Sequence, residues 1–132
     1  MRSRILSPVA ILGIGTFALL SGCAKPLPPN CMDETTLQAV KNEIVQDMRL
    51  KDRPSREAID ENLRLTSPRK VSLDDAAGKY RCAARLAAGA TFEVDIFYES
   101  SLQAGEHVVH VVDLTPADRF VIKEAFEAGI AR

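Results

Sequence analysis

The sequence predicts one α+β domain, a small antiparallel sheet of three to four strands with an N-terminal and a C-terminal helix and one disulfide bond. Two patterns and a cysteine count lead to this prediction. Apolar residues recur at helical spacing over residues 37–48 and again near the C-terminus. Between these segments, apolar and polar residues alternate as they do in strands. Consecutive strands with helices at both ends are typical of a sheet that carries its helices on one face.

The composition restricts the possible functions. The chain has 132 residues, which is enough for one domain. Its 17 basic and 18 acidic side chains give a net charge of -1, so the charge does not favour nucleic acid as a partner. It has no Trp and few aromatic residues, which argues against a stacking platform for bases. A hydrophobic content of 46% argues against a disordered chain.

The N-terminal region has the pattern of an export signal. Arg2 and Arg4 precede an uncharged apolar stretch over residues 5–20, and small residues follow it. This order is typical of a secretory signal peptide, here residues 1–22. The alternative is a transmembrane anchor, which needs roughly 20 apolar residues, whereas this stretch has about 16. We therefore expect the protein to be exported.

Residues 20–23, Leu-Ser-Gly-Cys, resemble the lipobox of bacterial lipoproteins. The resemblance covers residues 1–23 and implies that signal peptidase II cleaves before Cys23 and that the Cys23 sulfur carries lipid. Two or three acyl chains hold a protein stably on a membrane, whereas one holds it reversibly. Ala24 follows the cysteine, and in this family the absence of Asp there implies sorting to the outer membrane, facing the periplasm. The alternative is a chance cysteine after an ordinary signal peptide.

Residues 23–30 are expected to carry the lipid and an extended tether, and residues 31–132 the domain. Pro26, Pro28 and Pro29 favour a polyproline-like conformation in this segment. At about 3.1 Å per residue, the seven residues after the cysteine would hold the domain roughly 20 Å from the membrane.

The remaining cysteines, Cys31 and Cys82, are expected to form a disulfide bond. An exported domain is in an oxidising compartment, where two leftover thiols pair. Two buried free thiols or a metal pair are the alternatives, and the separation of the two cysteines does not match a zinc motif. Cys31 and the Gly-Lys-Tyr-Arg-Cys sequence at residues 78–82 are also similar to small proteobacterial lipoproteins, a resemblance that implies no activity.

Three helical segments are expected. The first is capped by Asp33 or Thr35 and runs to about Leu50, and a short second one runs from Ser55 through Glu61. The C-terminal helix begins after a Thr-Pro-Ala-Asp sequence at residues 115–118 and is stopped by a glycine. The residues expected on the inner faces of the two long helices, followed by that glycine, are Leu37, Val40, Ile44, Val45, Met48, Phe120, Val121, Ala125 and Gly129.

The first strand is expected from residue 63, and because Pro68 interrupts it, it should lie at an edge of the sheet or be bent. Further strands are expected over residues 80–86, 92–98 and 107–113. The central two are expected to form a hairpin with a loop of residues 88–90. The expected opposite pairs are Tyr80 and Tyr98, Cys82 and Ile96, Ala84 and Val94, Arg85 and Glu93, and Leu86 and Phe92. Residues 99–106 are polar and are expected to form a loop.

Residues with catalytic chemistry are few. His107 and His110 lie three apart on a predicted strand and point to opposite faces, so we expect no metal site, and no pattern predicts a cofactor. Ser100 and Ser101 lie near His107, but the sequence lacks a Gly-x-Ser-x-Gly elbow. We therefore expect a protein that is not an enzyme, and an enzyme that depends on His107 or His110 is the alternative.

Phe97 is an apolar residue on an otherwise charged strand face, between Asp95 and Glu99, with Arg81 expected opposite. Two interpretations stay open. Phe97 packs beneath Arg81 or beneath the second helix, or Arg81 and Phe97 anchor a partner protein, because aromatic residues and Arg dominate binding hot spots.

Together these features predict a membrane-anchored envelope lipoprotein that acts as a non-enzymatic binding or assembly module, an accessory of a secretion or cell-envelope complex. Its partners would be the membrane, through lipid on Cys23, and an envelope protein. The alternative is an inhibitor of a lytic enzyme such as lysozyme, which would insert the polar loop of residues 99–106 into the enzyme's active site.

Overall fold

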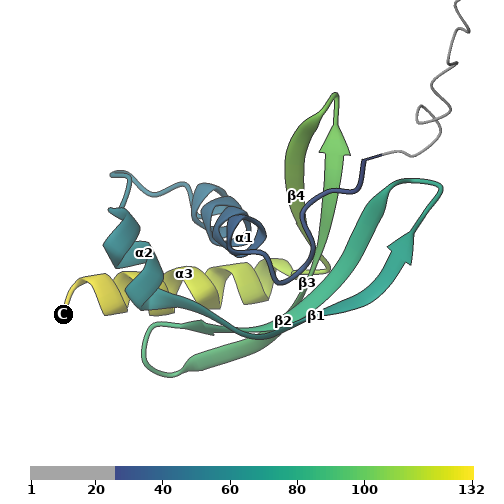
Figure 1. Ribbon diagram of the computed structural model, residues 1–132. Coiled ribbons are helices and arrows are strands. Elements are labelled where there is room, and N and C mark those ends of the chain that lie inside the picture. The colour runs from purple at the N-terminus through teal and green to yellow at the C-terminus, as the bar shows by residue number, and fades with distance from the viewer. Residues whose placement is uncertain (1–25) are drawn as a thin grey trace, which may run out of the picture.

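The computed structural model describes residues 26–132, which form a four-stranded antiparallel sheet and three helices. The strands are neighbours in chain order, β1-β2-β3-β4. The two long helices lie on one face of the sheet (Figure 1), so the predicted α+β class is confirmed. The elements are α1 (Glu34–Asp47), α2 (Arg56–Asn62), β1 (Leu63–Asp74), β2 (Lys79–Ala88), β3 (Phe92–Gln103), β4 (Glu106–Val112) and α3 (Pro116–Ile130).

The core lies between the inner face of the sheet and the helices. Alternation along the strands directs every second side chain inward, and the i, i+4 spacing of helical residues directs one stripe of each helix toward them. Complete burial of one large apolar side chain contributes roughly 1.5–3 kcal/mol to the stability of the fold. The largest fully buried apolar side chains are Val40, Leu63, Leu86, Ile96, Tyr98, Ile122 and Phe126.

The inner face of α3 differs from the expected one. Ile122 and Phe126 are buried, whereas Phe120 is 63% exposed and Val121 is also exposed. The prediction that Phe120 and Val121 face inward was therefore wrong, although Ala125 does pack against the core. Phe120 lies about 200° around the helix axis from Ile122, because each residue turns the helix by about 100°.

The β2-β3 hairpin has the expected faces but a different register. Leu86 pairs with Val94 and Cys82 pairs with Tyr98, so the partners are shifted by two residues from those predicted. The loop is residues 89–91 because Ala88 still pairs with Phe92. An even shift leaves every side chain on its predicted face. Arg85 consequently lies opposite Asp95, and its Nε reaches Glu93 Oε2 diagonally at 2.9 Å.

The expected loop over residues 99–106 was wrong. Strand β3 continues to Gln103, which pairs with Glu106, and only Ala104 and Gly105 connect β3 to β4. Both connecting residues have positive φ, 51° and 81°, as a two-residue hairpin turn of this type requires. The polar residues Ser100 and Ser101 are therefore strand residues and not part of a flexible loop.

Strand β1 forms one edge of the sheet, as Pro68 predicted. Its pairing with β2 shifts between Thr66 and Arg69, on either side of the proline, and Ser67 has φ 51°. Pro has no backbone N–H to donate, so it is tolerated at such an irregular edge position.

The expected side-chain caps are present at the starts of α2 and α3, whereas Asp33 lies at the N-cap position of α1 without a side-chain hydrogen bond to the helix. Ser55 Oγ accepts a hydrogen bond from the Ala58 N–H, and Thr115 Oγ1 accepts one from the Asp118 N–H, each at 3.1 Å. Gly129 does not stop α3, which continues to Ile130. A side chain at this glycine would collide with the Asn62 side chain, so Gly129 allows α3 to approach the end of α2.

The predicted disulfide bond between Cys31 and Cys82 is present, with 5.6 Å between the two Cα atoms. It joins the chain just before α1 to the middle of β2, and both cysteines are 1% exposed. The bond closes a loop with a sequence separation of 51 residues.

Replacing both cysteines, Cys31→Ser with Cys82→Ser, is expected to lower the free energy of unfolding by about 4 kcal/mol, because the open loop gives the unfolded chain more conformational entropy. Urea denaturation monitored by circular dichroism measures this. The native sequence in reductant is the matched control and should unfold like the double variant. An unchanged denaturation midpoint would contradict the expectation.

Gly89 and Gly78 provide a second test of the fold, because both have positive φ, 60° and 64°. Gly89→Ala places a Cβ against the Ala125 carbonyl of α3, whereas Gly78→Ala meets nothing within 4 Å. We expect Gly78→Ala to cost about 1 kcal/mol of backbone strain and Gly89→Ala about 3 kcal/mol, since overpacking adds to the same strain. Thermal denaturation compares the two, and equal costs would show that α3 does not restrict the β2-β3 turn.

Candidate functional site

The predicted partner-binding residues Arg81 and Phe97 lie together on the outer face of the sheet, which the helices leave uncovered (Figure 1). Phe97 is 43% exposed, and the Arg81 side chain is 62% exposed. Both line a shallow hollow of about 180 Å³ where β1 to β4 come together, and Val71 and Val112 also contribute apolar surface to it. We call Val71, Arg81, Phe97 and Val112 the outer-face patch.

Arg81 is not directly opposite Phe97 as expected. Ala83 takes that position, and Arg81 pairs with Glu99 as a result of the two-residue register shift. Ala83 is only 1% exposed although it belongs to the outer face. Ala83 does not line the hollow, and its burial shows that neighbouring side chains on the outer face cover it.

The charges near the patch are arranged as cross-strand pairs. Glu99 accepts from Lys79 Nζ at 3.0 Å and from Arg81 Nε at 3.4 Å. The hydrogen bond from Lys79 lowers the pKa of the Glu99 carboxyl, although partial burial opposes this. Arg81 is the exposed member of this group, and ion pairs of an exposed side chain contribute little stability. Glu99 also keeps its shorter bond to Lys79, so Arg81 can exchange Glu99 for a carboxylate on a partner at small cost.

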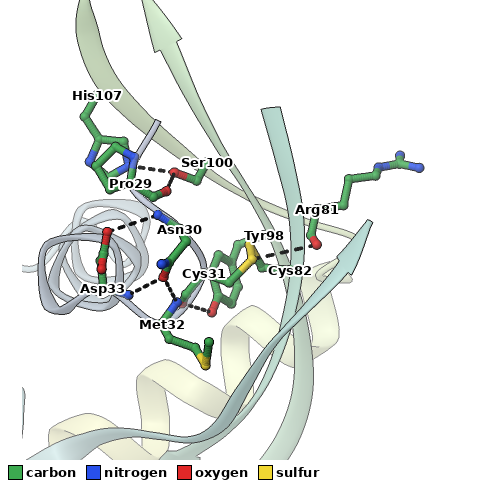
Figure 2. Close-up of a disulfide and its surroundings, with 10 residues drawn as sticks. All are labelled: Pro29, Asn30, Cys31, Met32, Asp33, Arg81, Cys82, Tyr98, Ser100 and His107. Atoms are coloured by element: carbon green, nitrogen blue, oxygen red, sulfur yellow. Dashed lines mark hydrogen bonds between the residues drawn. A yellow bond between two sulfur atoms is a disulfide. The ribbon is translucent and has the colours of Figure 1, made fainter. Parts of the chain in front are cut away.

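A second cluster attaches the chain before α1 to the inner side of the sheet (Figure 2). The Ser100 hydroxyl donates a hydrogen bond to the Pro29 carbonyl at 2.7 Å, and the Tyr98 hydroxyl donates one to the Cys31 carbonyl at 2.8 Å. The disulfide bond to Cys82 adds a covalent connection. We call Pro29, Cys31, Cys82, Tyr98 and Ser100 the N-terminal clamp.

The clamp shortens the tether that the sequence predicts over residues 23–30. Pro28 is buried, so the folded unit begins there and not at residue 31. Asn30 then turns the chain into α1: its Oδ1 accepts from the N–H groups of Met32 and Asp33 at 2.9 and 3.0 Å. Asp33 is the N-cap residue of α1, but its side chain accepts from the Asn30 N–H rather than from the helix. A proline-rich composition was therefore a poor guide to the length of the free segment.

Ser100 and His107 are brought together, with 2.7 Å between Ser100 Oγ and His107 Nε2. Ser100 is fully buried and its hydroxyl hydrogen is directed to the Pro29 carbonyl. His107 Nε2 must then be the donor to Ser100 Oγ, because that oxygen has no second hydrogen to offer. In this arrangement the imidazole cannot remove a proton from the serine, and the pair serves to hold the N-terminal segment.

His110 is separate from His107, on the exposed side of β4, and its Nδ1 lies 3.6 Å from Glu43 Oε1 of α1. The other carboxylate oxygen of Glu43 accepts from the Val111 N–H at 2.9 Å and so covers part of the β4 edge. Burial raises the pKa of the Glu43 carboxyl, whereas the hydrogen bond from Val111 lowers it. Within residues 26–132, no group of three or more His, Cys, Asp or Glu side chains could hold a metal ion.

Glu43 and Tyr98 are among the residues of these clusters that were not predicted as site residues from the sequence, and Ser100 was considered there only as a nucleophile near His107. Tyr98 was expected on the apolar strand face, and burial raises its pKa to about 12. Ser100 follows Tyr98 by two residues, so continuing the strand alternation would have placed it on the same inner face. No sequence pattern marks Glu43, whose role depends on the tertiary contact between α1 and β4.

The predicted lipidation site Cys23 and the predicted signal peptide lie outside the described residues. No helix in the described part of the chain is both long and apolar enough to span a membrane. Comparisons of the chain with protein-family models, with curated proteins and with solved structures find no match.

The clamp is expected to weaken at acidic pH. Burial lowers the pKa of His107 below 6.5, an effect that Asp33 partly opposes. As the pH falls below about 6.5 the unfolded chain takes up a proton at this position before the folded chain does, so the folded state loses stability. Glu43 acts in the opposite direction at lower pH, because its folded pKa is raised above 4.5.

The free energy of unfolding between pH 7.5 and pH 5.5 tests this in the native sequence and in His107→Gln. Gln cannot be protonated but can still donate to Ser100 Oγ. We expect the variant to lose less stability than the native protein over this range, and an identical pH dependence would show that His107 does not contribute.

Proposed function

We propose that the protein is an envelope lipoprotein, held on the membrane by lipid on Cys23, that acts as a non-enzymatic binding or assembly module for an envelope protein complex. The lipobox resemblance of residues 20–23 supports the anchor, and Ala24 supports a position on the outer membrane facing the periplasm. Export to an oxidising compartment also agrees with the Cys31–Cys82 bond.

The observation that carries the proposal is the N-terminal clamp. The segment that follows the anchor is joined to β2 by the disulfide bond and to β3 by two hydrogen bonds. An anchor on Cys23 would therefore fix the position of the sheet relative to the membrane, through contacts on the inner side of the sheet. The outer face of the same sheet stays free for a partner, as a docking module requires.

The outer-face patch is the proposed working surface. It combines an exposed aromatic ring, Phe97, with a guanidinium, Arg81, and these are the residue types that dominate binding hot spots. The apolar surface of Val71 and Val112 adjoins them. A complementary partner would present an apolar side chain to the hollow and a carboxylate to Arg81.

A non-enzymatic role is supported by the use of the Ser100–His107 pair. Among the described residues this is the pair closest to a nucleophile with a base, and both groups are engaged in holding Pro29. The inhibitor alternative depended on a polar loop at residues 99–106, and those residues form a regular hairpin instead.

Capture from the native envelope tests the proposal. The full-length lipoprotein is cross-linked in place before detergent extraction, and its partners are identified by mass spectrometry. We expect a stoichiometric envelope partner that is absent from the Cys23→Ala sample, because the unanchored protein no longer concentrates at the membrane.

The outer-face patch is tested by Phe97→Ala, which should lower capture at least about tenfold, as removal of a hot-spot residue does. Phe120→Ala is the matched control, since Phe120 is a more exposed phenylalanine on α3. Equal capture by both variants would exclude the patch as the working surface. Capture of a lytic enzyme in place of an envelope complex would favour the inhibitor alternative.

A further inference from the structure

We propose that the turns of the β1-β2 and β3-β4 hairpins form the membrane-facing end of the domain and contact the phospholipid headgroup layer. This inference rests on the proposed lipidation of Cys23. Both turns lie at one end of the sheet, beside the point where the N-terminal segment leaves the domain (Figure 1). We call residues 75–78 and 103–105 the hairpin tips.

The first described residue lies directly between these tips. Pro26 shares a hollow with Ala77 and Gly78 of one hairpin and with Leu102 and Gly105 of the other. Two residues later Pro28 is buried, and the clamp at Pro29 and Cys31 follows. The chain therefore enters the domain through the hairpin tips and is fixed immediately after it has passed them.

The distance from the anchor to the tips is short. Only Ala24 and Lys25 separate Cys23 from Pro26, and three fully extended residue steps span about 11 Å. The opposite end of the sheet, at the β2-β3 turn, is much farther away, because the ten residues of β2 rise about 33 Å. Lipid on Cys23 would thus place the hairpin tips at the membrane surface, and the β2-β3 turn well away from it.

The chemistry of the tips is compatible with close approach to headgroups. Five of the seven tip residues, Ala76, Ala77, Gly78, Ala104 and Gly105, are small and uncharged. Asp75 is the charged residue of the tips, and its need for hydration favours the headgroup layer over the hydrocarbon core. Leu27 follows Pro26, which lies at the tips, and its side chain is 53% exposed and can enter the headgroup layer.

The charges in and beside the tips indicate which headgroups are favoured. Asp74, Asp75, Glu99 and Glu106 are acidic, whereas Lys25, which precedes Pro26, and Lys79, which is paired with Glu99, are basic, so the acidic groups outnumber the basic ones. A surface with this excess of acid is repelled by anionic lipid, which attracts basic segments. The expected partner is therefore a zwitterionic phospholipid surface.

Tryptophan fluorescence can test this orientation because the chain contains no Trp. Single variants Ala77→Trp and Gln103→Trp place the probe at the two tips, and Ala90→Trp is the matched control in the β2-β3 turn; all three positions are exposed. Each full-length lipoprotein is reconstituted into phosphatidylcholine vesicles that contain a headgroup spin-labelled lipid. We expect quenching to be severalfold stronger at positions 77 and 103 than at position 90.

Two further measurements distinguish failure of the proposed orientation from failure of the proposed lipidation. Cys23→Ala combined with Ala77→Trp shows whether Trp binds the vesicles by itself, and it should show no quenching. Mass spectrometry of the N-terminal peptide establishes lipidation in each preparation. Equal quenching at all three positions in a lipidated protein would overturn the orientation and leave the proposed function intact. An N-terminal peptide without lipid would overturn both.

Discussion

The structure depends on the attachment of the chain before α1 to the inner side of the sheet. Tyr98 is the largest fully buried side chain, and its hydroxyl would be a costly unpaired group if the Cys31 carbonyl did not accept its hydrogen bond. Ser100, also fully buried, depends in the same way on the Pro29 carbonyl. The N-terminal segment is therefore itself part of the core. The disulfide bond holds this segment against the sheet even when the hydrogen bonds open. Asn30 and Asp33 then direct the chain into α1 within three residues, so the position of this helix over β4 follows from the same attachment.

The fold class could be predicted because periodicity separates the helical segments from the strands, although it gave the wrong buried face for α3 and the wrong end for β3. Cys82, Ala84 and Leu86 lie two residues apart and share a face, and no shift by an even number of residues changes that face. The register itself could not be predicted, because it depends on where Gly89 turns the chain. That choice is made by tertiary contacts: the Gly89 N–H donates to the Asn62 carbonyl, and α3 packs against the turn. The β3-β4 turn was missed for a related reason, since Ala104 and Gly105 lack the Asn or Asp that usually marks such turns.

The candidate sites show the same division between local and tertiary information. Predicting the disulfide bond required only the cysteine count and the expectation of an oxidising compartment. Predicting that Arg81 and Phe97 share a face required only strand alternation. Predicting the N-terminal clamp would have required knowing that β3 extends beyond residue 99, and the polar residues at 99–101 argued against such an extension. Glu43 was beyond sequence reasoning altogether, because its partner is a backbone N–H on β4, far along the chain. Side chains that serve the backbone of a distant element leave no periodic pattern in the sequence.

The clamp and the free outer face together restrict how an anchored protein of this shape could work. Strand β3, with 12 residues, is about 40 Å long, and its direction relative to the membrane follows from the end at which the chain enters. With the hairpin tips toward the bilayer, Phe97 lies near the middle of β3, and the outer face stands beside the membrane rather than on it. A partner would then approach parallel to the membrane surface and within about one domain length of it. A short, fixed connection favours partners that are themselves confined to the membrane, because a soluble partner could be reached equally well through a longer and looser tether.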